Sequence, residues 1–150
     1  MPVHRLLDLA EPDARADLPG LERAEVAQIM TRSVICVTPK WTLRELLVVL
    51  VEGNMGGVPV VDGSWRPIGI ISKSDVVRYV SEHGSVDGGT VADCMLPLTL
   101  SVTPDTKVAR AAALMAWEGI HRLPVCESSG DVVGIVSALD IVRWVAKIAG

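Results

Sequence analysis

Two short segments of the sequence carry the same polar residues in the same order. Ser72 and Asp75 follow the apolar run GII, and Ser137 and Asp140 follow GIV, so each pair sits where a strand would pass into a helix. Backbone N–H groups at such a junction attract anions, and a carboxylate there could accept two hydrogen bonds from a vicinal diol such as that of ribose. Ser-x-x-Asp is also close to a capping box, in which both side chains only close the first turn of a helix. The residue types alone leave both roles open.

The two pairs belong to a repeat that spans most of the chain. Residues 26–80 align with residues 91–145 without a gap, at a constant offset of 65 residues. In this alignment VTP is aligned with VTP, VPVV with LPVC and GIISKSDVVRYV with GIVSALDIVRWV. Such duplication predicts two similar half-domains, and units of this size are only marginally stable alone, so we expect them to contact each other. We place the repeats at 23–84 and 85–150, after an N-terminal arm at 1–22.

Each repeat contains the same series of expected elements. A short helical segment comes first, followed by β-branched strands at 34–37 and 99–102 that stop at the TP pairs, and then by a helix. In the first copy this helix begins at Thr42, and Glu45 lies three residues later, which is the spacing of a capping box. Two strands joined by a turn and a last helix follow, with Gly84 at the expected C-terminal cap. The glycine of each GI(I/V)S motif permits close approach of another backbone.

Composition and charge exclude several classes of function. The net charge is −4 and no basic run is present, which argues against a nucleic-acid partner. No apolar run approaches the roughly 18 residues that span a bilayer, and the first residues lack a signal-peptide core, so we expect a cytoplasmic protein without a membrane partner. The cysteines lack metal-ligand spacing, the histidines lack a nucleophile beside them, and glycine-rich phosphate motifs are absent. We therefore expect neither an enzyme nor a metal site.

In this order the motifs resemble a tandem pair of CBS domains, the module named after cystathionine β-synthase. The resemblance covers residues 23 to 148 and rests on the paired VTP, (V/L)PV and GI(I/V)S-x-x-D motifs. It implies an α+β fold of two βαββα units that contact each other through their sheets about a pseudo-twofold axis and leave two clefts. It also implies a Bateman module that requires no cofactor, binds an adenine nucleotide (AMP, ADP or ATP) or an adenosyl compound as a regulatory ligand, and commonly dimerises.

The resemblance also assigns residues to these clefts. Asp75 and Asp140 match the family's ribose-binding carboxylates, and Ser72 and Ser137 match the adjacent residue that faces the sugar or phosphate. The other candidates match positions around the adenine ring. They are Val58 and Leu123 before the motif proline, and Ser33 to Ile35 and Leu98 to Leu100 near the first strand.

The two copies differ where a phosphate is expected. The second copy has His121 and Arg122 where the first has Gly56 and Gly57. Arg122 could hold a phosphate with two parallel hydrogen bonds and His121 could assist, or both could be solvated residues favoured by a helix dipole. The first copy instead has Lys73 near the motif. We expect both clefts to accept a nucleoside, and the second copy's cleft to be better equipped for phosphate.

Two functions are consistent with the sequence. The first is a regulatory sensor that binds an adenine nucleotide and acts through its oligomeric state or through a separate effector protein. The alternative is a scaffold whose clefts are vestigial and whose function is assembly. A homodimer is predicted because residues 46–51 form a helix that is apolar on nearly every side, which its own half cannot cover, and because the final helices of the repeats are also apolar. Arg78 and Arg143, deeper in the last helices, are expected in ion pairs or at an interface.

Overall fold

The computed structural model describes residue 20 and residues 22–98 and 100–150. The N-terminal arm predicted at 1–22 lies almost wholly outside the described residues. The elements, in chain order, are η2 (Val26–Gln28), α1 (Leu43–Glu52), β1 (Gly57–Val61), β2 (Pro67–Ser72), α2 (Lys73–His83), α3 (Val91–Cys94), β3 (Leu96–Pro97), α4 (Val108–Glu118), β4 (Arg122–Cys126), β5 (Val132–Ser137) and α5 (Ala138–Ala149). None of the helices in these ranges is long and apolar enough to cross a membrane.

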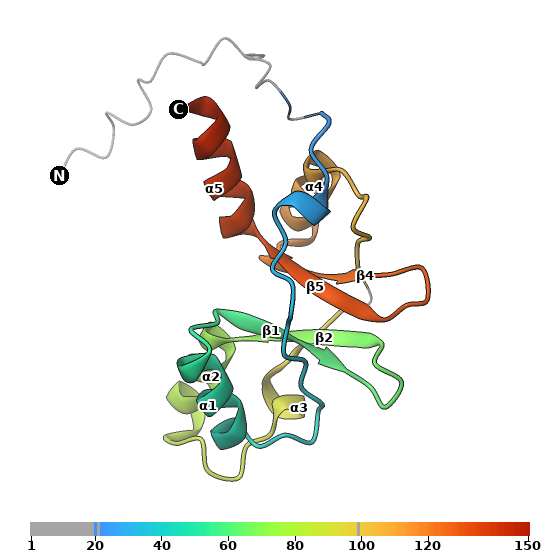
Figure 1. The fold of residues 1–150 in the computed structure, drawn as a ribbon. Helices are drawn as coiled ribbons and strands as arrows, with labels where there is room; N and C mark the ends of the chain where they lie inside the picture. The colour runs from blue at the N-terminus through green and yellow to red at the C-terminus, as the bar shows by residue number, and fades with distance from the viewer. Residues whose placement is uncertain (1–19, 21, 99) are drawn as a thin grey trace, which may run out of the picture.

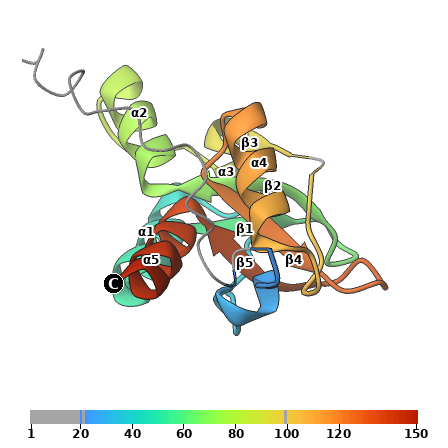
Figure 2. The same ribbon diagram turned by 90° about the horizontal axis from the view of Figure 1, so that it is seen from above.

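Each repeat forms an antiparallel hairpin that is covered by helices. β1 pairs with β2 so that Gly57 faces Ser72, and β4 pairs with β5 so that Arg122 faces Ser137, which is the same register 65 residues later. The two hairpins lie between α1 and α2 of the first repeat and α4 and α5 of the second (Figure 1). Viewed from above, the helices overlie the strands, and the turns of both hairpins project to one side (Figure 2). The expected α+β fold, in which two repeats meet through their sheets about a pseudo-twofold axis, is confirmed.

The opening segment of each repeat crosses to the other half. β3 of the second repeat pairs with β2 at Gly69 and Ile70, and Thr31 of the first repeat forms the equivalent bridge to Ile135 in β5. The two hydrophobic cores therefore each include residues from the opposite repeat. Val26 and Met30 are buried in the core of the second half, whereas Val91 is buried in that of the first. In Figure 1 the blue segment around η2 accordingly lies beside α4, and α3 lies beside the first repeat.

The strands predicted at 34–37 and 99–102 are wrong in extent. Residue 99 lies outside the described residues, and the described residues of each segment form one parallel bridge, from Val37 to Val60 and from Val102 to Val125. Ser33 has a left-handed φ of 56°, which bends the chain just before the first bridge, and Pro39 lacks an N–H to continue it. Both bridging valines are buried, so the apolar pattern indicated burial correctly and strand length incorrectly.

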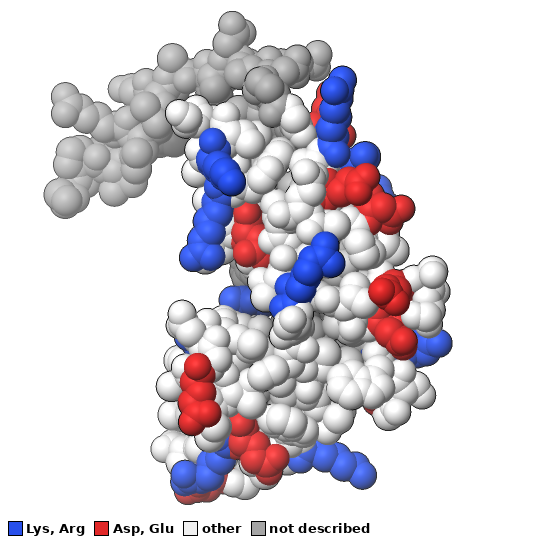
Figure 3. Space-filling view, in the orientation of Figure 1, with Lys and Arg blue, Asp and Glu red and all other residues white. Residues whose placement is uncertain are grey.

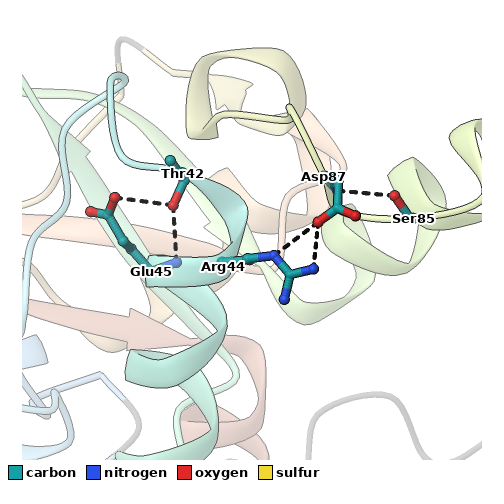
Figure 4. Close-up of polar contacts among 5 residues, drawn as sticks. All are labelled: Thr42, Arg44, Glu45, Ser85 and Asp87. Atoms are coloured by element: carbon teal, nitrogen blue, oxygen red, sulfur yellow. Dashed lines mark hydrogen bonds and ion pairs between the residues drawn. The ribbon is translucent and has the colours of Figure 1, made fainter.

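Capping residues fix the ends of the first-repeat helices as predicted. Thr42 Oγ1 accepts a hydrogen bond from Glu45 N at 3.2 Å and starts α1 (Figure 4). Gly84 ends α2 with a left-handed φ of 83°. Arg44 of α1 donates from Nε to Asp87 Oδ1 at 2.8 Å, so the segment between the repeats is held against the start of α1 (Figure 4).

Candidate functional site

Two clefts of similar size open where the halves meet. The Asp140 cleft has a volume of about 400 Å³ and is formed by the start of α5, the loop 53–57 after α1, and Thr31 and Val34. The Asp75 cleft has a volume of about 360 Å³ and is formed by the start of α2, the loop 119–122 after α4, and residues 94–96. Both volumes lie in the range of pockets that hold small molecules.

Each cleft combines a carboxylate from one repeat with a loop from the other. His121 lies in the Asp75 cleft, whereas Gly56 and Gly57 lie in the Asp140 cleft. The structure therefore does not bring His121 and Asp140 together, and it corrects the expectation that the second repeat builds its own phosphate-rich cleft. The physical reason is the face-to-face arrangement of the halves, which aims the loop after each first helix at the opposite repeat.

Asp75 and Asp140 close capping boxes with one carboxylate oxygen each. Ser72 N donates to Asp75 Oδ2 at 2.8 Å, and Ser137 N donates to Asp140 Oδ2 at 2.8 Å. The hydroxyl of each serine accepts a hydrogen bond from its aspartate's backbone N–H, at 3.4 Å in the first repeat and 3.0 Å in the second. Oδ1 takes no part in either cap, although both aspartates line their clefts. Capping therefore leaves one acceptor oxygen of each carboxylate for a ligand hydroxyl.

Arg78 and Arg143 also line the two clefts, one beside each aspartate. The i,i+3 spacing places each arginine on the same helix face as its carboxylate, one turn further along. Arg78 Nη1 lies 3.7 Å from Asp75 Oδ1, and 67% of the Arg78 side chain is exposed, so this ion pair is weak. The expectation of an ion pair was right for Arg78, but the cleft position of both arginines was not predicted from the sequence. Their spacing from Asp75 and Asp140 was the signal that could have found them.

Arg122 borders both clefts. Its side chain lies over Gly56 and Gly57: a Cβ built on Gly57 would lie 3.0 Å from Arg122 Cδ and Nε, and one on Gly56 would collide with the guanidinium. Gly57 and Arg122 occupy equivalent positions in the repeats. The exchange between the copies is therefore sterically complementary, because glycine on one side makes room for arginine from the other.

Apart from Val34, the remaining predicted residues line neither cleft, and they fall into two groups. One group is buried or half-buried in the cores, and the other is exposed beside the cleft walls. The first consists of Val58, Leu123, Leu98 and Leu100, and the second of Ser33, Ile35 and Lys73. Val34, which lies within the predicted stretch Ser33 to Ile35, does line the Asp140 cleft, and Met55 completes its apolar wall. In the Asp75 cleft the apolar wall comes from Met95 and Leu96. Three of these four belong to the exchanged opening segments, which a repeat alignment cannot place.

Cys94 lines the Asp75 cleft, and burial raises the pKa of its thiol, with the carboxylates of Asp93 and Asp75 adding to the effect. The thiol is therefore neutral near pH 7 and acts as an apolar part of the wall. Within the described ranges, histidine, cysteine and acidic residues form no cluster of three or more that could hold a metal. On the face drawn in Figure 3, side chains of both charge signs are interspersed, so this face carries no large patch of one sign.

Comparison with known proteins extends this picture. The CBS domain model matches residues 26–82 and 91–147. An uncharacterized protein of Methanopyrus kandleri is 32% identical over 124 residues, which is 82% of this chain and 63% of that protein's length, so this chain spans less than two thirds of it. The crystal structure of CBSX2 of Arabidopsis thaliana in complex with AMP is 29% identical, has a TM-score of 0.72, and is matched over 84% of this chain and 99% of that one.

A second solved structure shows the same arrangement. The CBS domain pair of protein MJ0100, in complex with 5′-methylthioadenosine and S-adenosyl-L-methionine, is 25% identical with a TM-score of 0.72, over 81% of this chain and 98% of that one. The two family matches cover most of the chain and coincide with the two sequence repeats. The chain therefore belongs to the CBS domain family and carries two CBS domains in tandem.

Proposed function

We propose that the protein is a regulatory module that binds adenosine-containing ligands in its two clefts. The observation that carries the proposal is the position of Asp75 and Asp140, which line the clefts while only Oδ2 of each closes a helix cap. Oδ1 can then accept a hydrogen bond from a ribose hydroxyl without loss of the cap. AMP in the CBSX2 complex, and methylthioadenosine and S-adenosylmethionine in the MJ0100 complex, support an adenosyl ligand.

The proposed contacts follow from the cleft walls. Asp75 and Asp140 bind ribose, Ser72 and Ser137 lie beside the sugar, and the arginines of each cleft meet the phosphate. The adenine ring contacts the apolar walls, formed by Val34 and Met55 in the Asp140 cleft and by Met95 and Leu96 in the Asp75 cleft. AMP, ADP and ATP differ in charge, so the cleft arginines and His121 are the groups that would distinguish them.

Calorimetry on single aspartate variants tests the proposal. Asp75→Ala and Asp140→Ala each remove a ribose acceptor and a cap, so each should abolish or strongly weaken one of two binding events for AMP, ADP, ATP or S-adenosylmethionine. The lost cap should lower the free energy of unfolding by only about 0.5–2 kcal/mol. Asp93→Ala is the matched control, because Asp93 closes the same kind of box with Thr90 at the start of α3 and lines neither cleft.

The control separates capping from binding. Asp93→Ala should lower stability by a similar amount and leave both binding events unchanged. If none of the adenosyl compounds binds the wild-type protein below millimolar concentration, the sensor proposal fails and the scaffold with vestigial clefts is the better description. If all three alanine variants bind alike, the aspartates act only as helix caps.

We further propose that the output is delivered through a homodimer, which presents the bound state to a separate effector. The second-repeat helices expose Leu139 and Val142, with 61% of Val142 accessible, beside an apolar groove of about 390 Å³ between α4 and α5. Such a groove is typical of a face that another copy covers. Light scattering at micromolar concentration should show a dimer for the wild type and a monomer for Val142→Glu.

Ser128→Glu is the matched control for the dimer experiment, because it adds the same charge at an exposed turn between β4 and β5. It should remain dimeric. A wild-type protein that is monomeric at micromolar concentration contradicts the dimer without affecting the ligand proposal.

A further inference from the structure

A single guanidinium stands at the border of both clefts. Arg122 lines the Asp140 cleft and the Asp75 cleft, and its Cα pairs with that of Ser137 across β4 and β5. Its side chain extends from there over Gly56 and Gly57, and Gly57 in turn pairs with Ser72. Arg122 thus connects the serine–aspartate pair of one cleft with that of the other.

The Arg122 guanidinium is available to a ligand. Among the described residues it makes no ion pair with a carboxylate, and none of the hydrogen bonds involves it. The side chain is half-buried, and Gly56 and Gly57 leave room around it that any larger residue would fill. An arginine in such a position can direct its fork to an anion on either side at little steric cost.

The other basic residues of the clefts belong to one cleft each. Arg143 lines only the Asp140 cleft, and Arg78 and His121 contribute to the Asp75 cleft but not to the Asp140 cleft. Within the described clefts, Arg122 is therefore the cation that both would use for a phosphate.

We infer that Arg122 couples the two clefts, so that a phosphorylated ligand in one weakens the binding of a phosphorylated ligand in the other. The inference rests on the proposed adenosyl function. A guanidinium carries one positive charge and offers one bidentate fork, so the phosphate that binds first takes it. The second phosphate then enters a site that has lost its shared cation. An uncharged nucleoside does not use the guanidinium, so two nucleosides bind independently.

The test compares the intact protein with variants in which one cleft is disabled. Asp75→Ala reports the affinity of the Asp140 cleft when its neighbour is empty, and Asp140→Ala reports the converse. In wild-type protein the second AMP should bind about ten-fold or more weakly than it binds to the same cleft in the single-cleft variant, a size typical of coupling between sites. With adenosine, the wild-type affinities should equal those of the two variants.

Arg122→Gln isolates the arginine. It should weaken AMP binding in each cleft about ten-fold, leave adenosine binding unchanged, and abolish the coupling, so that the two AMP steps become independent. Arg110→Gln is the matched control, because Arg110 is exposed on α4 and lines neither cleft. It should keep both the AMP affinities and the coupling.

The outcomes separate this inference from the proposed function. Independent binding of two AMP molecules to the wild type would overturn the coupling and leave the adenosyl function standing. Coupling that persists in Arg122→Gln, or a second AMP that binds more tightly than in the single-cleft variant, would also overturn it. If neither AMP nor adenosine binds the wild type, the adenosyl function has failed and the coupling fails with it.

Discussion

At the scale of single residues, the capping and ligand roles of the Ser-x-x-Asp motif are compatible rather than competing. The motif alone left the two roles open, because both use the same residue types at the same spacing. The structure divides them between the oxygens of each aspartate, with Oδ2 in the cap and Oδ1 outside it. Sequence spacing predicts the cap, but the assignment of individual oxygens depends on the rotamer and could not be predicted.

Cys94 offers a chemical probe of the Asp75 cleft. Burial raises the pKa of its thiol, and the thiolate is the reactive form, so alkylation by iodoacetamide should be slow at pH 7. The rate should keep rising with pH beyond the point at which an ordinary cysteine is fully ionised. An adenosyl ligand that fills the cleft should protect Cys94, which mass spectrometry of the alkylated peptides can measure.

Cys36 is the internal control for this experiment. Burial raises the pKa of its thiol as well, but it lines neither cleft. Its alkylation should therefore rise with pH in the same direction and should not respond to ligand. Equal protection of Cys36 and Cys94 would mean that ligand tightens the whole protein instead of covering the Asp75 cleft.

At the scale of elements, the GI(I/V)S glycines explain how the opening segments cross between the halves. A Cβ at Gly69 would lie 2.7 Å from Leu96 O, and one at Gly134 would lie 2.8 Å from Thr31 O. The sequence predicted close backbone approach at these glycines, and the structure confirms it. The sequence did not predict which backbone segment approaches each glycine, because that segment belongs to the other repeat and leaves no local pattern.

Gly134→Ala should therefore destabilise the protein. The added methyl group meets a backbone carbonyl, which cannot rotate away as a side chain would, so Thr31 must move and its bridge to Ile135 weakens. A loss of about 1–3 kcal/mol in the free energy of unfolding, typical of overpacking, is expected from urea denaturation.

Gly63→Ala is the matched control, since Gly63 lies in the exposed turn between β1 and β2, and a Cβ there meets nothing within 4 Å. Its stability should be unchanged or slightly higher, because alanine restricts the unfolded chain. If both alanine variants keep wild-type stability, the close approach at Gly134 has no energetic cost and the crossing does not depend on it.

At the scale of the whole molecule, the repeat predicted two similar halves correctly, but the core of each half includes residues from the start of the other repeat. The alignment starts both repeats at their short helical segments, near Val26 and Val91, yet each of these valines is buried in the core of the opposite half. A sequence repeat marks duplicated units of chain, whereas a core is defined by contacts, and the two boundaries differ here by one segment.

This difference predicts which fragment of the chain folds. A fragment of residues 35–98 contains every buried residue of the first-half core, from Val37 to Val91, and β3 as well. A fragment of residues 20–84 has almost the same length and contains one whole sequence repeat, but it lacks Val91 and carries Val26 and Met30 without the core that buries them.

Urea denaturation followed by circular dichroism compares the two fragments. Residues 35–98 should unfold in a cooperative transition, although at a lower urea midpoint than the full chain, because the sheet face that meets the second half is exposed. Residues 20–84 should show a broad, non-cooperative change, since its core has a cavity where Val91 belongs and apolar side chains remain exposed. If residues 20–84 instead unfold cooperatively and residues 35–98 do not, the sequence repeat is the folding unit. The exchanged segments are then not needed for either half to fold.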